Sequence, residues 1–372
     1  MRLASEATEH LAATPPTTGV TGVTARSTRL RYLDDFRTLA ILQIVLLHVT
    51  RTYLIRGMEA RAPESNLVFA INDALFHNAT LYFTLISGIL YLRLVTGRPL
   101  QRFYLGRATS VLLPYLVMTV CLTLAVGQAG EGGVAGLLAR IATNALLGEA
   151  FYTLWYVPVI LILYLASPFL LVIVRRPAYA PLVAILICLP LLFPRTGTEV
   201  TLSTIIYFGG AYVLGLTIGL DLDRWLDRFE RWQEALLAAV LITTAAIVYL
   251  YVTGIHFVGP VDLRESAFYV QKLALGALFL VWLRRAEPRR PSRIAVLSGA
   301  TAAMSFGIYF LHAPIIRQLV YAFGPFGTGP GPGWMASLHI GFLFAATMGL
   351  CIAIIQVIRA IFGRYSKWVI GA

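Results

Sequence analysis

Charged side chains are scarce in this sequence. Of its 372 residues only 13% are Asp, Glu, Lys or Arg, whereas 58% are hydrophobic, and the mean hydropathy is +0.76. A soluble domain carries about 25% charged residues, because its surface must face water. The shortage excludes an ordinary water-soluble domain and predicts that most of the protein surface faces lipid.

Cysteine is also scarce, and the three cysteines are Cys121, Cys188 and Cys351. All three lie within apolar runs and none has the spacing of a zinc site, so we interpret them as small packing residues. The sequence therefore predicts no metal site.

Three further patterns are absent. No apolar segment of the kind found in a secretory signal occurs in residues 1–28, which are rich in Thr, Ala, Pro and Gly. The alternation typical of barrel strands is missing, as is the internal repeat of many transporters. We predict a disordered cytoplasmic N-terminal segment over 1–28, followed by an all-α, polytopic transmembrane domain over 29–372.

Long apolar runs dominate the remainder, and a helix needs about 20 apolar residues to cross a bilayer. We predict about ten spans, and expect the fifth, which is crowded by prolines, to be the shortest. They are placed at Phe36–Leu54, Ala74–Val95, Ser110–Gly127, Leu154–Val174, Ala180–Phe193, Leu202–Leu220, Ala235–Gly254, Ala267–Leu283, Ala302–Val320 and Leu338–Ile358.

Basic residues alternate between the connections, and together they give a net charge of +12. Their place in short loops follows the positive-inside rule, so we do not predict a nucleic-acid partner. The rule predicts a multi-pass protein of the cell membrane with both termini in the cytoplasm. The predicted cytoplasmic arginines include Arg26, Arg29, Arg31, Arg37, Arg93, Arg98, Arg102, Arg107, Arg175, Arg176, Arg224, Arg228, Arg231, Arg284, Arg285, Arg289, Arg290, Arg293, Arg359 and Arg364.

The first predicted outer connection is an exception, because it carries Arg51, Arg56 and Arg61. Basic residues on that side suggest a functional role. A second local feature is Asp221–Gln233, whose Leu222, Trp225, Leu226, Phe229 and Trp232 share one face, and which predicts an amphipathic helix lying in the cytoplasmic interface.

The strongest candidate for chemistry is a motif at the first span, in which Asp34 and Arg37 are followed by His48. At helical rise His48 lies roughly 16 Å deeper than Arg37. Asp34 could simply cap the helix, and Arg37 could mark the membrane boundary. An imidazole at mid-membrane depth is more indicative of function. The charge of Arg51, three positions on, favours the neutral imidazole that can accept a proton.

Five motifs follow one another along the chain from about Arg31 to the C-terminus. They are Leu33-Asp34-x-x-Arg37 with His48, Phe83-Thr-Leu-Ile-Ser87-Gly88, Phe103-Tyr104-x-x-Arg107 with Pro114-Tyr115, Leu154-Trp155-Tyr156 with Tyr164, and Ser305-Phe-Gly-Ile-Tyr309-x-x-His312. This ordered set resembles the acyltransferase-3 family of membrane acyltransferases. Gly106 and Ser110 stand where family members often carry arginines, which leaves Arg107 and Arg102 in the third motif.

The resemblance implies transfer of an acyl group, commonly acetyl, from cytoplasmic acyl-CoA to a hydroxyl of a carbohydrate or other acceptor, as in polysaccharide O-acetylation. Such an enzyme transfers groups other than amino-acyl groups and needs no cofactor beyond the acyl-CoA co-substrate. His48 would be the general base or a transient acyl carrier, and Asp34 would orient Arg37 or cap the helix. The catalytic set implied by the resemblance is His48, Arg37 and Asp34, with Arg37 also placed to meet the anionic part of CoA. Substrate binding is assigned to Arg107, Arg102, Trp155, Tyr309 and His312.

The remaining polar residues are weaker candidates. His312 could be structural as readily as functional, and Ser87-Gly88 is more typical of close helix packing than of catalysis. His77 and Asp73 could line an outer mouth. Asp262, Arg264, Glu265 and His256 are interpreted as a solvated outer loop. The alternative to an enzyme is a polytopic transporter or flippase without covalent chemistry.

Overall fold

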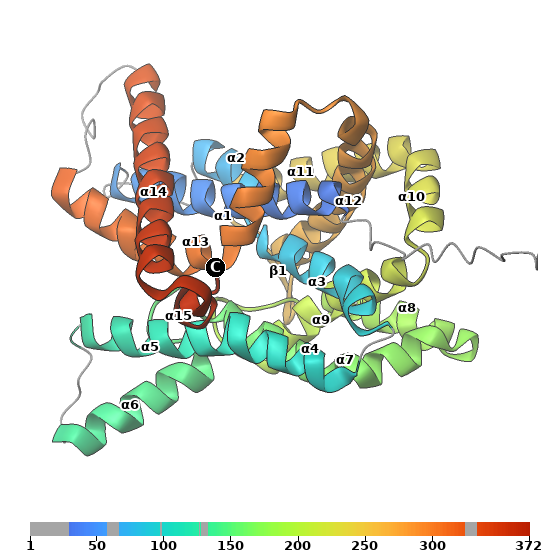
Figure 1. Cartoon of the computed structure of the whole chain (residues 1–372). Helices are drawn as coiled ribbons and strands as arrows, with labels where there is room; N and C mark the ends of the chain where they lie inside the picture. Colours follow the sequence, from blue (N-terminus) through green and yellow to red (C-terminus); the bar gives the residue numbers. More distant parts are fainter. Residues whose placement is uncertain (1–29, 58–66, 97–98, 126, 128–132, 324–332) are drawn as a thin grey trace, which may run out of the picture. The chain divides into compact units, whose positions relative to one another are not determined.

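A computed structural model describes residues 30–57, 67–96, 99–125, 127, 133–323 and 333–372. Arg31–Ala372 form one compact unit that is almost entirely α-helical, as the sequence predicted (Figure 1). The N-terminal segment 1–28, which was predicted to be disordered, lies outside the described residues, as do Arg29, Arg61 and Arg98.

Among the described residues the strands form one two-stranded antiparallel hairpin, β1 (Phe257–Val258) with β2 (Val261–Asp262). The described helices are α1 (Arg31–Gly57), α2 (Leu67–Phe76), α3 (Thr80–Val95), α4 (Leu100–Arg107), α5 (Leu113–Ala125), α6 (Gly133–Leu147), α7 (Tyr156–Arg175), α8 (Ala180–Cys188), α9 (Leu202–Leu220), α10 (Leu222–Arg231), α11 (Gln233–Thr253), α12 (Leu263–Ala286), α13 (Ser292–Phe323), α14 (Gly333–Phe362) and α15 (Ser366–Ile370).

Eight helical segments in the described part of the chain are long and apolar enough to cross a membrane. They correspond to eight of the predicted spans. The first predicted span lies in α1, whose 27 residues extend about 40 Å. The fifth predicted span is the short apolar segment Pro177–Leu191, as expected. Pro181 at the start of α8 and Pro190 in the 3₁₀ turn after it limit this helix.

The outer faces of several spans are apolar and exposed. On α11, Leu241, Ile242 and Tyr249 each expose more than 60% of their surface. Contiguous exposed apolar surface of this kind suits lipid rather than water. The surface therefore supports the bilayer placement that composition predicted.

Close helix packing centres on α3 and α9, which lie against each other. A Cβ on Gly88 of α3 would meet Tyr212 O at 2.4 Å, and one on Gly215 of α9 would meet Leu85 O at 2.3 Å. The two glycines let the backbones approach. The packing role predicted for the Ser87-Gly88 pair matches this geometry.

The second predicted span is not one continuous helix, which corrects the sequence interpretation. It breaks between α2 and α3, where Asn78 has a φ of 60°. Asn tolerates this left-handed conformation better than most residues. The Asn78 side chain holds the break, because it donates to Glu265 Oε2 at 2.8 Å and to Tyr207 Oη at 3.1 Å.

The third predicted span also differs from the sequence interpretation, because the helix is longer than predicted. α4, a π-helical turn over Ala108–Leu112 and α5 run on as one segment, Leu100–Ala125. Arg107 therefore lies within a long helix rather than in a loop before it. π-turns of this kind often occur at functional sites, because they change the direction in which side chains point.

The predicted amphipathic helix is present as α10, capped by Asp221, which accepts from the Arg224 N–H. Leu222, Leu226 and Phe229 are buried on its apolar face, whereas Trp232 is exposed. Its polar side pairs with α12 through Arg284 with Asp223 and Asp227, and Arg285 with Glu230.

Candidate active site

His48 faces a cavity of about 370 Å³, named here the His48 cavity. Side chains from α1, α13 and the segments before α3, α7 and α9 form its wall. The lining residues are Ile44, Leu47, His48, Arg51, Thr52, His77, Asn78, Ala79, Thr80, Tyr152, Thr153, Trp155, Arg195, Thr198, Tyr309, Ile316 and Arg317.

Two rings flank the His48 imidazole. The centroid of Tyr152 lies 5.5 Å away in an edge-on arrangement, and that of His312 lies 5.1 Å away. Within the described residues nothing hydrogen-bonds to the His48 ring, so its nitrogens are available to a ligand in the cavity.

His312 is completely buried beside His48. Its Nδ1 lies 3.1 Å from the carbonyl of Ile308 and 2.7 Å from that of Tyr309, the positions of acceptors for an Nδ1–H. This assigns the lone pair to Nε2, which is buried without a hydrogen-bond partner in the described part of the chain. His312 therefore combines structural hydrogen bonds with a basic nitrogen beside His48.

Trp155 and Tyr309 also line the cavity, as a shared substrate-binding role requires. The Tyr309 hydroxyl donates to the carbonyl of Thr153, which ties α13 to the turn before α7. The Trp155 ring lies under Arg195, with the guanidinium carbon 5.2 Å from the ring centroid.

Arg37 and Arg107 share a second, smaller cavity of about 70 Å³, named here the arginine cavity. The Arg107 guanidinium lies over the rings of Phe103 and Tyr164, at 5.5 and 5.4 Å. Its Nε is buried with no hydrogen-bond partner among the described residues. The cavity is lined by Arg37, Phe83, Ile86, Ser87, Leu90, Leu94, Phe103, Arg107 and Tyr164.

The two cavities lie toward opposite ends of the same helices. Along α1 the arginine cavity is reached at Arg37 and the His48 cavity from Ile44 onward, whereas along antiparallel α3 the order is reversed. Arg37 and His48 are separated by roughly 16 Å along the helix axis. The helices α1 and α3 therefore contribute to both a cationic pocket and a histidine-lined pocket, one nearer each end.

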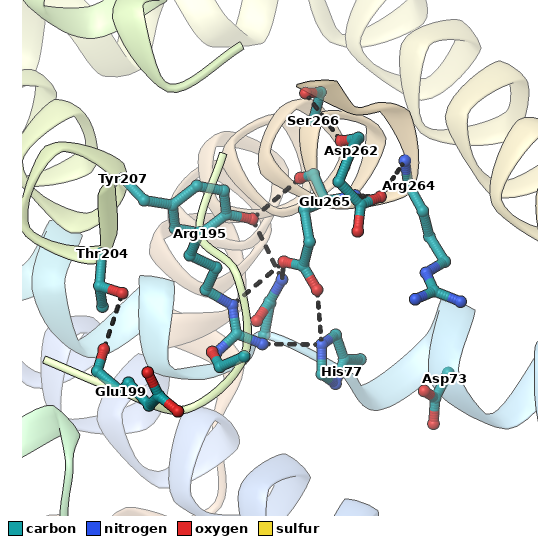
Figure 2. A network of polar contacts seen from close by, with 12 residues as sticks. Asp73, His77, Arg195, Glu199, Thr204, Tyr207, Asp262, Arg264, Glu265 and Ser266 are labelled. Atoms are coloured by element: carbon teal, nitrogen blue, oxygen red, sulfur yellow. Dashed lines mark hydrogen bonds and ion pairs between the residues drawn. The ribbon is translucent and has the colours of Figure 1, made fainter. Parts of the chain in front are cut away.

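A buried polar network supports the wall of the His48 cavity (Figure 2). Glu265 on α12 accepts from Arg195 Nε at 3.1 Å and lies 3.2 Å from His77 Nε2, while Arg195 Nη2 is 2.9 Å from the same ring nitrogen. Glu265 is only 9% exposed, so interpreting it as part of a solvated loop is wrong. A buried carboxylate needs such partners because desolvation is costly.

A second group of polar contacts extends this network along α2. Asp73 is fully buried and accepts from the Tyr251 hydroxyl at 2.7 Å, while Arg51 Nη2 lies 3.8 Å away. Lys272 on α12 donates to the carbonyls of Ala74 and Leu75 at 3.3 and 3.0 Å, near the helix break. Asp73 thus belongs to a buried scaffold behind the cavity, whereas His77 also lines the cavity itself.

Two of the predicted site residues lie in neither cavity. Arg102 is exposed on α4. Asp34 is partly buried in the first turn of α1, where its negative charge interacts favourably with the positive end of the helix dipole. Its neighbour Asp35 instead contacts Arg290 and the Ser298 hydroxyl, which fixes α1 to the start of α13.

Sequence reasoning missed Arg195, Arg317 and Tyr152, all of which line the His48 cavity. The signal that could have found the two arginines is their place near predicted outer ends of spans, where basic residues are uncommon. Burial raises the pKa of Tyr152 to about 12, and the positive charges of Arg51 and Arg317 oppose the increase. Both arginines line the same cavity as Tyr152, whose hydroxyl is neutral at physiological pH.

Metal ligands do not gather in the part of the chain that the structure describes, where no group of three His, Cys, Asp or Glu is placed to hold an ion. The ionisable side chains that line the two cavities carry imidazole, guanidinium and phenol groups.

A family model described as an acyltransferase domain, that of the acyltransferase-3 family, matches residues 30–356. The matched range contains every residue that lines the two cavities. No curated protein matches the chain, and no solved structure does. The family match confirms the resemblance that the motifs carry.

Proposed function

This chain belongs to the acyltransferase-3 family and is a membrane acyltransferase, not a transporter without covalent chemistry, and from that premise we propose its substrates and mechanism. The donor is cytoplasmic acetyl-CoA, and the acceptor is a hydroxyl of a carbohydrate or other small molecule. Modification of a polysaccharide is the corresponding biological role, and both termini are in the cytoplasm.

The observation that carries the proposal is the position of His48. Its ring faces a cavity large enough for a sugar unit, without a protein hydrogen-bond partner among the described residues. A neutral imidazole in that position can remove a proton from an acceptor hydroxyl.

The reaction proceeds by attack of the acceptor oxygen on the thioester carbonyl carbon. His48 takes the hydroxyl proton as the new C–O bond forms. The C–S bond then breaks, and the proton passes to the departing CoA sulfur. Acetyl ester and free CoA are the products, and no external oxidant or reductant is required.

Donor binding is assigned to the arginine cavity. CoA is polyanionic, and the guanidinium groups of Arg37 and Arg107 line one small cavity. Guanidinium pairs with phosphate through two parallel hydrogen bonds. The extended pantetheine arm can cover the roughly 16 Å from there to His48.

The test is turnover by the purified protein in detergent. Acetyl-CoA is supplied with and without an acceptor mixture of free sugars, and CoA release is followed with a thiol reagent. We expect CoA release by wild-type protein and its loss in His48→Ala. His256→Ala is the matched control, since His256 is partly exposed and lies outside both cavities. Absence of CoA release and of CoA binding in wild-type protein contradicts the proposed donor.

A further inference from the structure

Three arginines line the His48 cavity, and no carboxylate among the described residues lines it. Cavity walls with one sign of charge concentrate ligands of the opposite sign. The net positive charge of the cavity depends on how far carboxylates outside its lining neutralise each arginine.

The positive charge of Arg195 is neutralised by the carboxylate of Glu265. Its guanidinium is bound to Glu265, to the carbonyl of Gly197 at 3.2 Å and to His77. Its side chain is only 5% exposed. Three of the five N–H groups of Arg195 are thus engaged by the wall itself.

The positive charge of Arg51 is neutralised only in part. Its Nη2 is 3.8 Å from Asp73 Oδ2, at the limit of a salt bridge, and Asp73 already accepts the shorter bond from Tyr251. The Arg51 Nε is buried and has no hydrogen-bond partner in the described part of the chain. Arg51 therefore retains binding capacity.

Arg317 is not compensated by any carboxylate among the described residues. Its guanidinium carbon lies 5.3 Å from the ring centroid of Phe151, a contact that leaves the hydrogen-bond donors unused. Arg51 and Arg317 both act electrostatically on Tyr152, whose ring lies against His48. One volume is therefore bounded by two available cations and by the proposed base.

We propose that the acceptor is anionic and that Arg51 and Arg317 bind its carboxylate or phosphate group within the His48 cavity, so that a hydroxyl of the same molecule reaches His48. The inference rests on the proposed function and adds the substrate class. Both arginines line the same cavity next to the imidazole, and both remain accessible, since the Arg51 side chain is 39% exposed and Arg317 is exposed.

The phosphates of CoA are the other source of negative charge. Arg37 and Arg107 lie in the arginine cavity at the other end of α1, which makes Arg51 and Arg317 the acceptor's partners. CoA binding therefore forms one arm of the test, and acceptor preference forms the other.

The acceptor arm compares glucuronic acid with its methyl ester, a pair that differs in charge but retains the ring hydroxyls. Acetyl transfer is measured as kcat/KM for wild-type protein, Arg317→Gln, Arg317→Lys and the control Arg140→Gln. Arg140 is exposed on α6 and lines neither cavity. We expect wild type to favour the acid about ten- to a hundredfold, the value of one charge-assisted contact.

Arg317→Gln should lose most of that preference through a higher KM for the acid, and Arg317→Lys should restore part of it. Arg140→Gln should keep the wild-type preference. Equal kcat/KM for acid and ester in wild-type protein overturns the proposal, as does a loss in Arg317→Gln of the same size for both acceptors.

The binding arm separates this inference from the proposed function. Thermal unfolding is measured with CoA, with glucuronate and with the methyl ester. We expect glucuronate, and not the ester, to stabilise wild-type protein, and Arg317→Gln to abolish that shift. Weaker CoA binding in Arg317→Gln assigns the arginine to the donor and overturns the anionic acceptor, as does equal or absent stabilisation by both sugars. Failure of the proposed function appears differently, as loss of CoA binding and turnover in wild-type protein.

Discussion

The imidazole of His48 on α1 lies against that of His312 on α13, with 5.1 Å between the ring centroids, although the two belong to motifs at opposite ends of the sequence. His48 faces the cavity, whereas His312 is buried behind it and bound to backbone carbonyls. In the proposed reaction His48 contacts the substrate, and His312 lies behind it.

We expect His48→Ala to reduce kcat by about 10²- to 10⁴-fold, the contribution of a positioned general base. CoA binding and protein abundance should stay close to wild type, because the ring faces open volume. Turnover and CoA binding of the purified variant measure the two effects. Near-normal turnover would refute the role and direct attention to His312.

Arg37→Ala and Arg107→Ala should each raise the donor KM about ten- to a hundredfold, since a charge-assisted hydrogen bond contributes about 1.5–3 kcal/mol. Arg37→Lys should rescue only partly, because an ammonium cannot make the forked contact. The exposed Arg224 on α10 provides a control, Arg224→Ala. An unchanged donor KM with reduced abundance would show that Arg37 only anchors α1.

Glu265→Ala should strongly destabilise the protein, because it leaves Arg195 buried without its carboxylate. Breaking a buried ion pair in this way costs about 3–5 kcal/mol. The exposed pair of Glu230 with Arg285 is the comparison, and Glu230→Ala should cost about 1 kcal/mol or less. Thermal unfolding in detergent distinguishes them, and equal shifts would contradict the structural role of Glu265.

Gly88→Ala should destabilise the packing of α3 against α9, by about 1–3 kcal/mol for an overpacked contact. The added Cβ meets backbone atoms of α9, which cannot rotate away. Gly106→Ala on α4 is the matched control, because a Cβ there meets nothing within 4 Å. A loss of stability in Gly106→Ala alone would contradict this packing.

The membrane orientation is tested with single cysteines in a background that lacks Cys121, Cys188 and Cys351. Cysteines at the exposed Thr196 and Val258 should react with an impermeant thiol reagent in intact cells. Cysteines at Ala178 and Ser292 should react only after permeabilisation. Labelling of Ser292 in intact cells would reverse the proposed placement of the termini.

The sequence was sufficient for the features that depend on local pattern. Apolar run length predicted the membrane class and most spans, and the prolines around Pro190 predicted the short fifth segment. The spacing from Arg37 to His48 on one helix set their relative depth, because helical rise is constant. The ordered motifs also carried the family resemblance, since each is a short local pattern.

Contacts between helices could not be read from the same pattern. Glu265 looked like a loop residue because it follows polar neighbours, yet α12 places it beside Arg195 and Asn78 from two other segments. The break at Asn78 was hidden within an apolar run, because its φ of 60° is held by partners distant in sequence.

The sequence by itself therefore determined that this protein is a helical membrane protein, where most of its spans lie and which histidine and arginines carry its motifs, because hydrophobicity and spacing act along the chain. Only the tertiary structure decided that Arg37 and Arg107 share one cavity, that His48 faces another beside Arg51 and Arg317, and that Arg102 lies in neither. The physical reason is that cavities form where side chains from several helices fail to fill the space between them, and that depends on how the helices pack.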